Sequence, residues 1–240
     1  MPISTELTRM AQNVGALNAD TNAIFDALRA KGVYVPANAQ LSDVADMIET
    51  IEVPLPTVNI GGKDYPYVQI GNQLWIAEDL NNEFTGITIG HADNSATASY
   101  YNNDPQYGLY YSGWSLPIIE QNLPTGWRIP TYNDYTILIG YVGGVSVAGR
   151  ELKASTDWIS GSGLNTYGLT ILPTGRIGDQ SNGFNSAGYG SYCRIWLNTL
   201  YPGYPNSDYY MQFTDSDEVN LDSFQLLNFS LKVRLVKDVT

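Results

Sequence analysis

The distribution of aromatic residues changes abruptly near residue 53. All 5 tryptophans and all but one of the 18 tyrosines follow this point. Tryptophan and tyrosine bury large surfaces, so the chain after residue 53 can build a large hydrophobic core and the chain before it cannot. Between them, Val53-Pro54-Leu55-Pro56-Thr57 carries two prolines, which fix φ and remove backbone donors. We therefore expect two domains, at 1–52 and 58–240, joined by a linker at 53–57.

The first domain has the apolar spacing of short helices. This spacing predicts helices over Leu7–Leu17, Thr21–Lys31 and Leu41–Thr50. Helices of this length are marginal in water and bury little surface together. We therefore expect residues 1–52 to be a helical attachment and oligomerisation module that is stabilised by self-association or by a docking partner.

Capping residues mark the ends of these predicted helices. Ser4 or Thr5 is the expected N-cap of the first helix and Asp20 that of the second. Gly32 is expected to end the second helix. The following Val33–Pro36 segment should be extended, because a residue before proline avoids the α region.

Charge and cysteine content exclude several functions. The 12 Lys and Arg residues against 24 Asp and Glu residues give a net charge of −12, which disfavours nucleic acid and anionic lipid as partners. The single cysteine, Cys193, allows no internal disulfide and no cysteine-based zinc site. The chain start shows no secretory signal, and no apolar run is long enough to insert into a membrane.

The second domain has the pattern of short strands and many turns. Two apolar runs around Gly71-Asn72 predict a β-hairpin over Tyr67–Ile76. Residues Asn133–Tyr141 fit a helix opened by Thr131 or Asn133, and alternation over Leu226–Val236 predicts one closing strand. Residues 181–222, rich in Gly, Asn, Ser, Tyr and Asp, show no period that would assign them.

Five segments of this domain, in order, resemble the motifs of the Fibrobacter succinogenes major paralogous domain. They are Tyr67–Asn81, Leu123–Thr131, Gly149–Trp158, Tyr167–Gly175 and Val233–Asp238.

The resemblance implies an α+β fold of the C-type lectin-like class, with short strands and long loops. Relatives of that fold include formylglycine-generating enzyme-like domains and variable receptor-binding proteins of phages. The chain departs from the family at Leu123 and Leu235, where cysteine is usual, which argues against a family disulfide. Residues Ala27–Pro36 and Leu41–Ile51 are similar to the helical N-terminal modules of phage tail and virion proteins.

Catalytic residues are poorly represented. Formylglycine generation needs a reactive cysteine pair, and Cys193 has as its possible base only His91, the single histidine. A pair of carboxylates for glycoside hydrolysis is available within Asp215–Asp222, where a solvated acidic turn is the simpler interpretation. A calcium ion near these acidic residues remains an open alternative, although the segment does not fit an EF-hand and the sugar-binding calcium triplets of C-type lectins are absent. We expect no enzyme activity, no cofactor and no assigned metal site.

Tryptophans at the motif positions Trp75, Trp127, Trp158 and Trp196 are expected in the core. The late tyrosines differ, because they lie among Ser, Asn, Gly and Asp. This composition is typical of antibody-type binding surfaces, with ordinary loop tyrosines as the alternative interpretation. The predicted binding residues are Tyr189, Tyr192, Tyr201, Tyr204, Asp208, Tyr209 and Tyr210.

These inferences predict a non-enzymatic phage virion fibre or decoration protein, synthesised in the host cytoplasm and exposed on the particle. Residues 1–52 would bind other virion proteins and form a homotrimer, and residues 58–240 would bind a host-surface glycan or protein. One alternative is a structural adaptor or cap within a head or tail fibre. Others are a bacterial surface protein of the same family and, less favoured, a glycan-cleaving domain.

Overall fold

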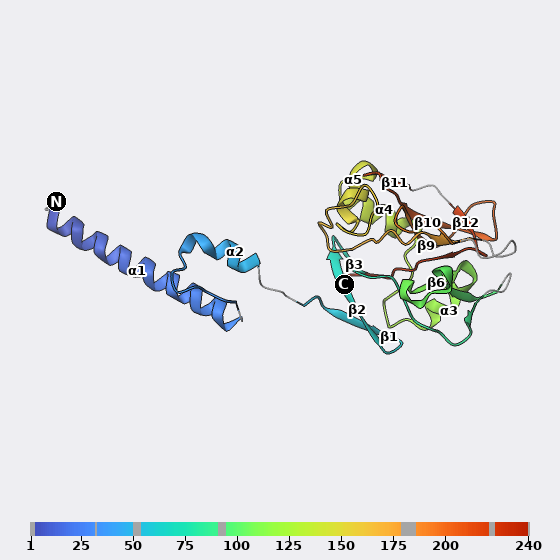
Figure 1. The fold of residues 1–240 in the computed structure, drawn as a ribbon, viewed down its shortest axis with the longest axis horizontal. Coiled ribbons are helices and arrows are strands. Elements are labelled where there is room, and N and C mark those ends of the chain that lie inside the picture. Colours follow the sequence, from blue (N-terminus) through green and yellow to red (C-terminus); the bar gives the residue numbers. More distant parts are fainter. Residues whose placement is uncertain are drawn as a thin grey trace. The chain divides into compact units, whose positions relative to one another are not determined.

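The chain divides into two compact units, Met1–Pro54 and Leu55–Thr240 (Figure 1). The division falls within the predicted linker at residues 53–57. The computed structural model describes residues 3–31, 33–49, 54–90, 95–178, 186–220 and 224–239. Among these residues, no helix combines the length and the hydropathy that a membrane crossing requires.

The first unit is dominated by one long helix, α1, which spans Ile3–Ala30. The prediction of two helices separated at Asp20 was therefore wrong, as were the N-caps at Ser4 or Thr5, since the helix already includes these residues. The Thr21 hydroxyl donates to the Leu17 carbonyl at 2.9 Å, so this polar residue is satisfied within the helix. Without a glycine or proline near Asp20, nothing in the sequence ends the helix there.

The rest of the first unit folds back on the C-terminal part of α1. Residues 33–36 belong to neither a helix nor a strand. The predicted third helix begins as a 3-10 turn at Leu41–Asp43 and continues as α2 over Val44–Glu49. The described core of this unit is small, and its buried residues are Phe25, Leu28, Val35 and Met47. Gly32 lies outside the described residues.

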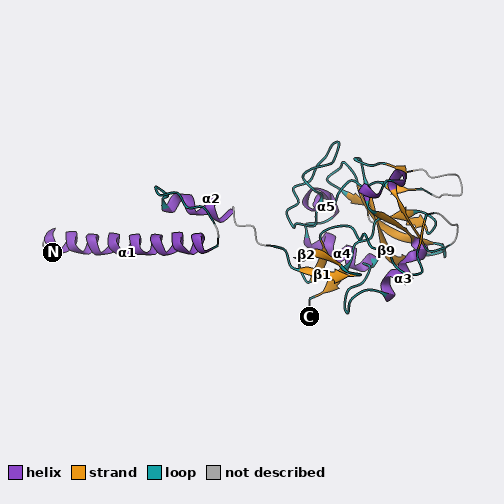
Figure 2. Cartoon of the chain, turned by 60° about the horizontal axis from the view of Figure 1, so that its bottom comes forward, coloured by secondary structure: helices purple, strands orange, loops and turns teal. Residues whose placement is uncertain are grey.

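The second unit is an α+β structure in which loops take up much of the chain (Figure 2). Its helices are α3 Leu116–Gln121, α4 Tyr132–Tyr141 and α5 Val145–Leu152, with 3-10 turns at Tyr101–Asn103, Pro105–Tyr107 and Gly113–Ser115. Its strands are β1 Thr57–Ile60, β2 Lys63–Ile70, β3 Gln73–Ile76, β4 Thr88–Ile89, β5 Thr97–Tyr100, β6 Leu109–Ser112, β7 Arg176–Ile177, β8 Ser186–Ala187, β9 Cys193–Leu200, β10 Ser207–Phe213, β11 Val219–Asn220, β12 Phe224–Leu226, β13 Ser230–Leu231 and β14 Val236–Asp238.

The predicted hairpin is confirmed as strands β2 and β3, in which Val68 pairs with Trp75. Gly71 has φ of +60°, which fits the first central residue of a type II′ turn. Strands β1 and β14 extend this hairpin into a sheet of order β1-β2-β3-β14.

Helix α4 begins where the sequence predicted. The Thr131 hydroxyl accepts from the Asp134 backbone N–H at 3.2 Å, and the Asp134 carboxylate accepts from the Thr131 N–H at 2.8 Å. This reciprocal pair is a capping box. Arg128 then pairs with the same carboxylate at 2.8 Å, which fixes the start of α4 against the motif that precedes it.

The chain end does not form the predicted single strand over Leu226–Val236. It contributes instead to three sheets: β12 pairs with β10, β13 with β6 and β7, and β14 with β3. Nearly every residue from Ser230 to Val236 is buried, because the segment passes through the interior between these sheets. Arg234 within it forms a buried ion pair with Asp79 at 2.6 Å.

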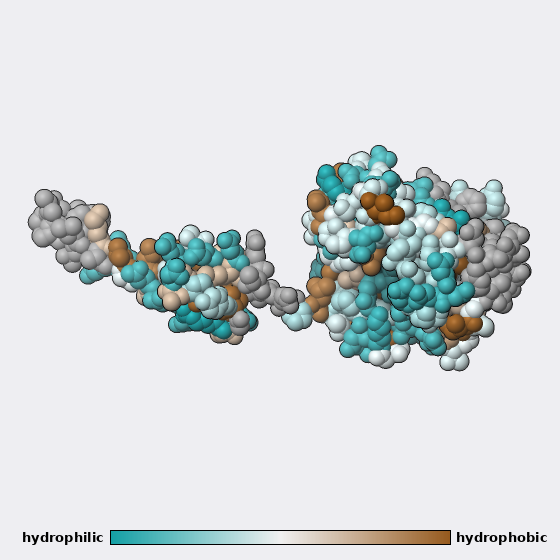
Figure 3. Space-filling model, in the orientation of Figure 1, coloured by the Kyte–Doolittle hydropathy of each residue, from teal (hydrophilic) through white to brown (hydrophobic). Residues whose placement is uncertain are grey.

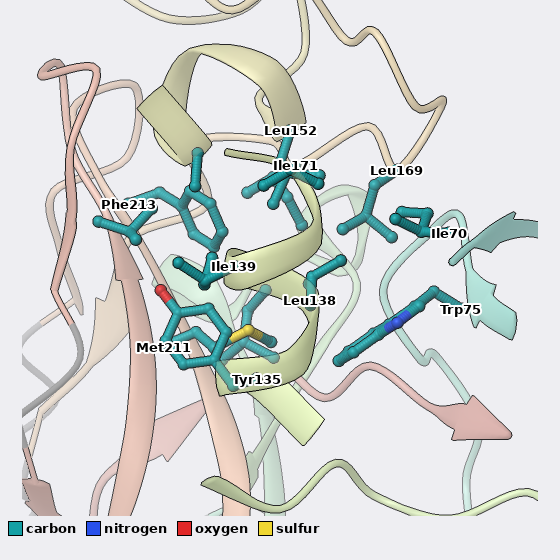
Figure 4. Packing of buried hydrophobic residues seen from close by; sticks show 14 of the residues in the cluster. Ile70, Trp75, Tyr135, Leu138, Ile139, Leu152, Leu169, Ile171, Met211 and Phe213 are labelled. Carbon is teal, nitrogen blue, oxygen red and sulfur yellow. The ribbon is translucent and has the colours of Figure 1, made fainter. Parts of the chain in front are cut away.

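Two large apolar clusters form the core of the second unit. One gathers α4, α5 and the strands beside them, and Figure 4 shows Tyr135 and Ile139 of α4 on the side of Met211 and Phe213 of β10, with Leu138 on the side of Trp75. The other lies between β3, α3 and the chain end. The predicted core tryptophans are confirmed as buried members of these clusters: Trp75, Trp127, Trp158 and Trp196.

Candidate functional site

The late tyrosine-rich segment, which sequence period left unassigned, folds as a β-hairpin of β9 and β10. The two strands are antiparallel, and Trp196 pairs with Tyr210. The register shifts between Asp208 and Tyr210, which places a bulge at the start of β10. The hairpin therefore carries most of the predicted binding residues on one rigid element and the turn that connects its strands.

The connecting turn is held by its own backbone. The Tyr201 N–H donates to the Ser207 carbonyl at 2.8 Å, and the Tyr204 N–H donates to the Tyr201 carbonyl at 3.0 Å. Gly203 between them has φ of +84°, which favours glycine. Pro202 restricts the backbone further. The turn is thus rigid although it is exposed.

Four tyrosines pack around this turn, and we call Tyr132, Tyr201, Tyr204 and Tyr209 the Tyr201 cluster. Ring centroids lie 4.5 Å apart for Tyr132 and Tyr209, 4.8 Å for Tyr201 and Tyr209, and 5.6 Å for Tyr201 and Tyr204. Tyr204 is 52% exposed, and the other three are partly buried. The cluster therefore presents aromatic surface to solvent while its rings support one another.

Tyr132 joins this cluster from the start of α4. Its N–H donates to the Thr199 hydroxyl of β9 at 3.0 Å, which ties the helix start to the hairpin. Sequence analysis did not select Tyr132 as a binding residue. The sequence signal that could have identified Tyr132 was the predicted N-cap at Thr131. The residue after an N-cap lies at the end of its helix, where it can reach the surface.

Asp208 is buried, so it does not contribute an exposed carboxylate as predicted. Burial raises the pKa of Asp208 to about 6. Its neighbours along β10 are also withdrawn from solvent, since Ser207 is buried and Tyr209 is partly buried. Asp208 is better placed to support the hairpin than to contact a ligand.

Tyr210 was also predicted to bind and lies instead in the core. It is 5% exposed and belongs to the same apolar cluster as Trp196. The Arg194 guanidinium carbon lies 4.7 Å from its ring centroid. The correction follows from strand geometry, since Tyr209 and Tyr210 cannot both face solvent.

Tyr189 and Tyr192 lie at the opposite end of β9 from the Tyr201 cluster. A strand of this length spans about 26 Å at the usual rise per residue. Tyr189 is 44% exposed and packs at 4.7 Å from Tyr107 and 5.6 Å from Tyr101, neither of which was predicted. The structure therefore divides the predicted site into two tyrosine groups.

The second group is anchored more deeply than the first. Tyr110 is buried beneath Tyr101, and its hydroxyl donates to the Thr174 carbonyl at 2.5 Å. The Lys232 ammonium lies 3.8 Å from the Tyr110 ring centroid, and burial lowers the pKa of Lys232 to about 8. Tyr192 is partly buried, with the Arg194 guanidinium carbon 5.3 Å from its ring centroid. We interpret this group mainly as packing.

The geometry around Cys193 favours a packing role over catalysis. Its side chain is fully buried beside the Thr174 hydroxyl at 3.2 Å. Burial raises the pKa of the Cys193 thiol to about 12, which keeps it protonated and poorly nucleophilic. His91, its proposed base, lies outside the described residues.

The acidic segment after β10 is organised by a lysine. The Lys153 ammonium donates to the backbone carbonyls of Gly161, Thr214 and Ser216, and it lies 4.8 Å from the Trp158 ring centroid. Burial lowers the pKa of Lys153, and the charges of Asp217 and Asp215 raise it. The Lys153 ammonium therefore supplies a positive charge to three carbonyl oxygens of this part of the fold.

The acidic side chains of this segment are poorly arranged for chemistry. Asp215, Asp217 and Glu218 are exposed, and Asp222 lies outside the described residues. Among the described residues, no group of three or more His, Cys, Asp or Glu side chains is arranged to hold a metal ion.

Two open clefts of the second unit lie away from the Tyr201 cluster. One, of about 500 Å³, is bordered by Gln212, Thr214 and Glu218 beside the acidic segment. The other, of about 720 Å³, is bordered by Tyr67, Leu74 and Tyr167. None of the four tyrosines of the Tyr201 cluster lines either cleft.

Comparison with known proteins gives one match. The profile of the Fibrobacter succinogenes major domain matches residues 68–237, which is most of the second unit. No curated protein matches the chain. No solved structure matches it either.

Proposed function

The chain belongs to the Fibrobacter succinogenes major domain family, and we propose that it is a non-enzymatic phage virion fibre or decoration protein that binds a host-surface glycan. Its second unit, for which we propose a C-type lectin-like fold, would contact the host. Its first unit would attach to other virion proteins. The resemblance of residues 27–51 to helical modules of virion proteins supports this division of roles.

The Tyr201 cluster is the observation that carries the proposal. Its rings are positioned by a turn with fixed backbone hydrogen bonds, so little conformational entropy is lost on binding. Tyrosine supplies rigid contact area with a hydroxyl at the edge, and the apolar faces of sugar rings stack on such surfaces. Exposed Asn206 in the same turn adds an amide that can accept and donate hydrogen bonds.

Binding to an array of bacterial surface glycans tests the proposal with the full chain. We expect Tyr204→Ala and Tyr201→Ala each to weaken glycan binding at least tenfold without a change in melting temperature of more than a few degrees. Tyr141→Ala is the matched control, because it removes an exposed tyrosine of the same unit outside this cluster. Equal binding by all three variants would exclude the Tyr201 cluster as the site.

The structural adaptor remains the main competing function. It predicts no binding to glycans or host cells and tight binding to a purified virion protein. In that case the same two variants should weaken the contact with the virion protein. The glycan proposal fails if the parent chain binds virion particles and binds no glycan.

A further inference from the structure

Helix α1 carries an apolar stripe that the rest of the first unit does not cover. Met10, Val14 and Leu17 are between 55% and 58% exposed, and Ile24 is exposed as well. Among the described side chains of α1, the buried ones are Phe25 and Leu28, near its C-terminal end. Figure 3 shows apolar patches on the surface of this unit.

The exposed stripe is part of a heptad pattern that runs along α1 and ends at Leu28, which is buried in the first unit's own core. Successive positions are separated alternately by four and three residues: Ile3, Leu7, Met10, Val14, Leu17, Thr21, Ile24 and Leu28. In heptad terms, Leu7, Val14, Thr21 and Leu28 occupy a positions, and Ile3, Met10, Leu17 and Ile24 occupy d positions. A repeat of 3.5 residues is typical of helices that wrap around one another, whereas a helix that covers a globular core follows 3.6.

The residues beside the stripe fit further copies of the same helix. Between residues 10 and 21, the flanking e and g positions hold Ala11, Asn13, Asn18 and Asp20. These side chains are small or neutral except for Asp20. Identical helices can therefore approach along the stripe with little repulsion, although the whole chain has a net charge of −12. A heptad stripe is also complementary to itself, which a stripe evolved for an unrelated groove need not be.

We propose that α1 assembles three copies of this chain into a parallel coiled coil through this heptad stripe. Leucine at a with isoleucine at d, as at Leu7 with Ile3 and Ile24, shifts the preference toward three or four strands, whereas Val14 at a with Leu17 at d also fits two. Thr21 also occupies an a position, but its hydroxyl is already bonded to the Leu17 carbonyl, so the alignment rests on the spacing of the apolar positions. This assembly does not depend on glycan binding, so the assembly proposal and the glycan proposal can fail independently of each other.

Light scattering of the full chain tests the assembly. We expect three times the mass of one chain at micromolar concentration, and a threefold lower mass for Leu17→Asp. Ala19→Asp is the matched control, because it adds the same charge two residues away at an outward f position and should leave the mass unchanged. A monomeric parent chain, or equal loss of assembly in both variants, would overturn the proposal. The tryptophan fluorescence of the second unit checks that each variant remains folded there.

Cysteine cross-linking tests the parallel arrangement. In parallel helices, the residues at position 10 of neighbouring copies meet, whereas antiparallel helices centred on α1 would bring position 10 near position 24. Met10→Cys should therefore form disulfide-linked dimers under mild oxidation within the trimer. The native Cys193 is buried and should not compete. An assembled Met10→Cys protein without cross-links would overturn the parallel alignment.

Discussion

The two units of this chain differ in where their stabilising contacts lie. The second unit places four of its five tryptophans in two apolar clusters and draws strands from distant segments into shared sheets. The first unit has a described core of Phe25, Leu28, Val35 and Met47, and it leaves a long stripe of α1 exposed. Burial of apolar surface is the main favourable term in folding, so the second unit can be stable by itself and the first would gain from the proposed assembly.

This difference also separates the functional surfaces. In the second unit, the exposed aromatic side chains lie outside the two apolar clusters that form its core. In the first unit, the exposed apolar side chains of α1 form the surface that the proposed assembly would bury. Substitution of an exposed residue should therefore affect ligand binding in one unit and assembly in the other. The following predictions sharpen this contrast, from the largest expected effect to the smallest.

Trp196→Ala should have the largest effect on stability. Trp196 is fully buried, and its indole N–H donates to the Tyr111 carbonyl at 2.7 Å. We expect the free energy of unfolding of the second unit to fall by about 4 kcal/mol, the usual cost of such a truncation. Urea unfolding followed by fluorescence measures it, with the exposed Ile159→Ala as control at less than about 0.5 kcal/mol. A cost below about 1 kcal/mol would show that burial in this core does not dominate the stability of the second unit.

Lys153→Met should cost about 3 kcal/mol, because it leaves three backbone carbonyls without their ammonium donor. Lys63→Met is the control. Lys63 pairs with Glu78 at 2.9 Å on the surface, where loss of an ion pair costs less than about 1 kcal/mol. Equal effects of the two substitutions in thermal unfolding would contradict an organising role for Lys153.

Asp208→Asn should stabilise the second unit at neutral pH. The pKa of Asp208 is raised to about 6, so the protonated carboxyl stabilises the folded state at low pH, and this contribution is lost as pH rises through about 6. At pH 7.5 we expect a gain of about 2 kcal/mol for the variant, allowing for partial solvent access. At pH 4 the gain should vanish. Unfolding measured between these values checks the trend, and a gain that does not vary with pH would refute it.

Gly15→Ala should have the smallest effect and act on the first unit. Gly15 lies inside α1, and a methyl group there meets no atom within 4 Å. Alanine favours helix over glycine by about 1 kcal/mol. The helical circular dichroism signal should therefore melt at higher temperature, while Ala19→Gly on the same exposed side of α1 should lower it. No change in either variant would indicate that α1 is already fully stabilised by other contacts.

Local signals in the sequence predicted part of the fold. The β2–β3 hairpin and the capped start of α4 were correct, because a glycine at a turn and a Thr131 cap act over a few residues. The prediction of one closing strand was wrong, because the pairing partners of its two ends, Leu226 and Val236, lie 19 and 161 residues away in the sequence. Apolar alternation shows that such a segment is buried but not which sheet each residue joins.

The proposed binding surface was predictable only in outline. The composition of the late segment pointed to the tyrosines, and the hairpin does expose Tyr204. The sequence did not reveal that Tyr210 faces inward, since either face of an isolated strand can be the buried one. Nor did it place Tyr132 beside Tyr209, because α4 and β10 meet only in the folded unit.

The ammonium group of Lys153 has a consequence for how the acidic segment responds to its surroundings. A dissociable ion stabilises a loop by mass action, so its contribution depends on the free ion concentration and disappears on dilution or chelation. A cation that is covalently part of the chain cannot diffuse away, and its effective concentration at Thr214 and Ser216 is fixed by the fold. This segment should therefore keep the same conformation in media of very different ionic composition.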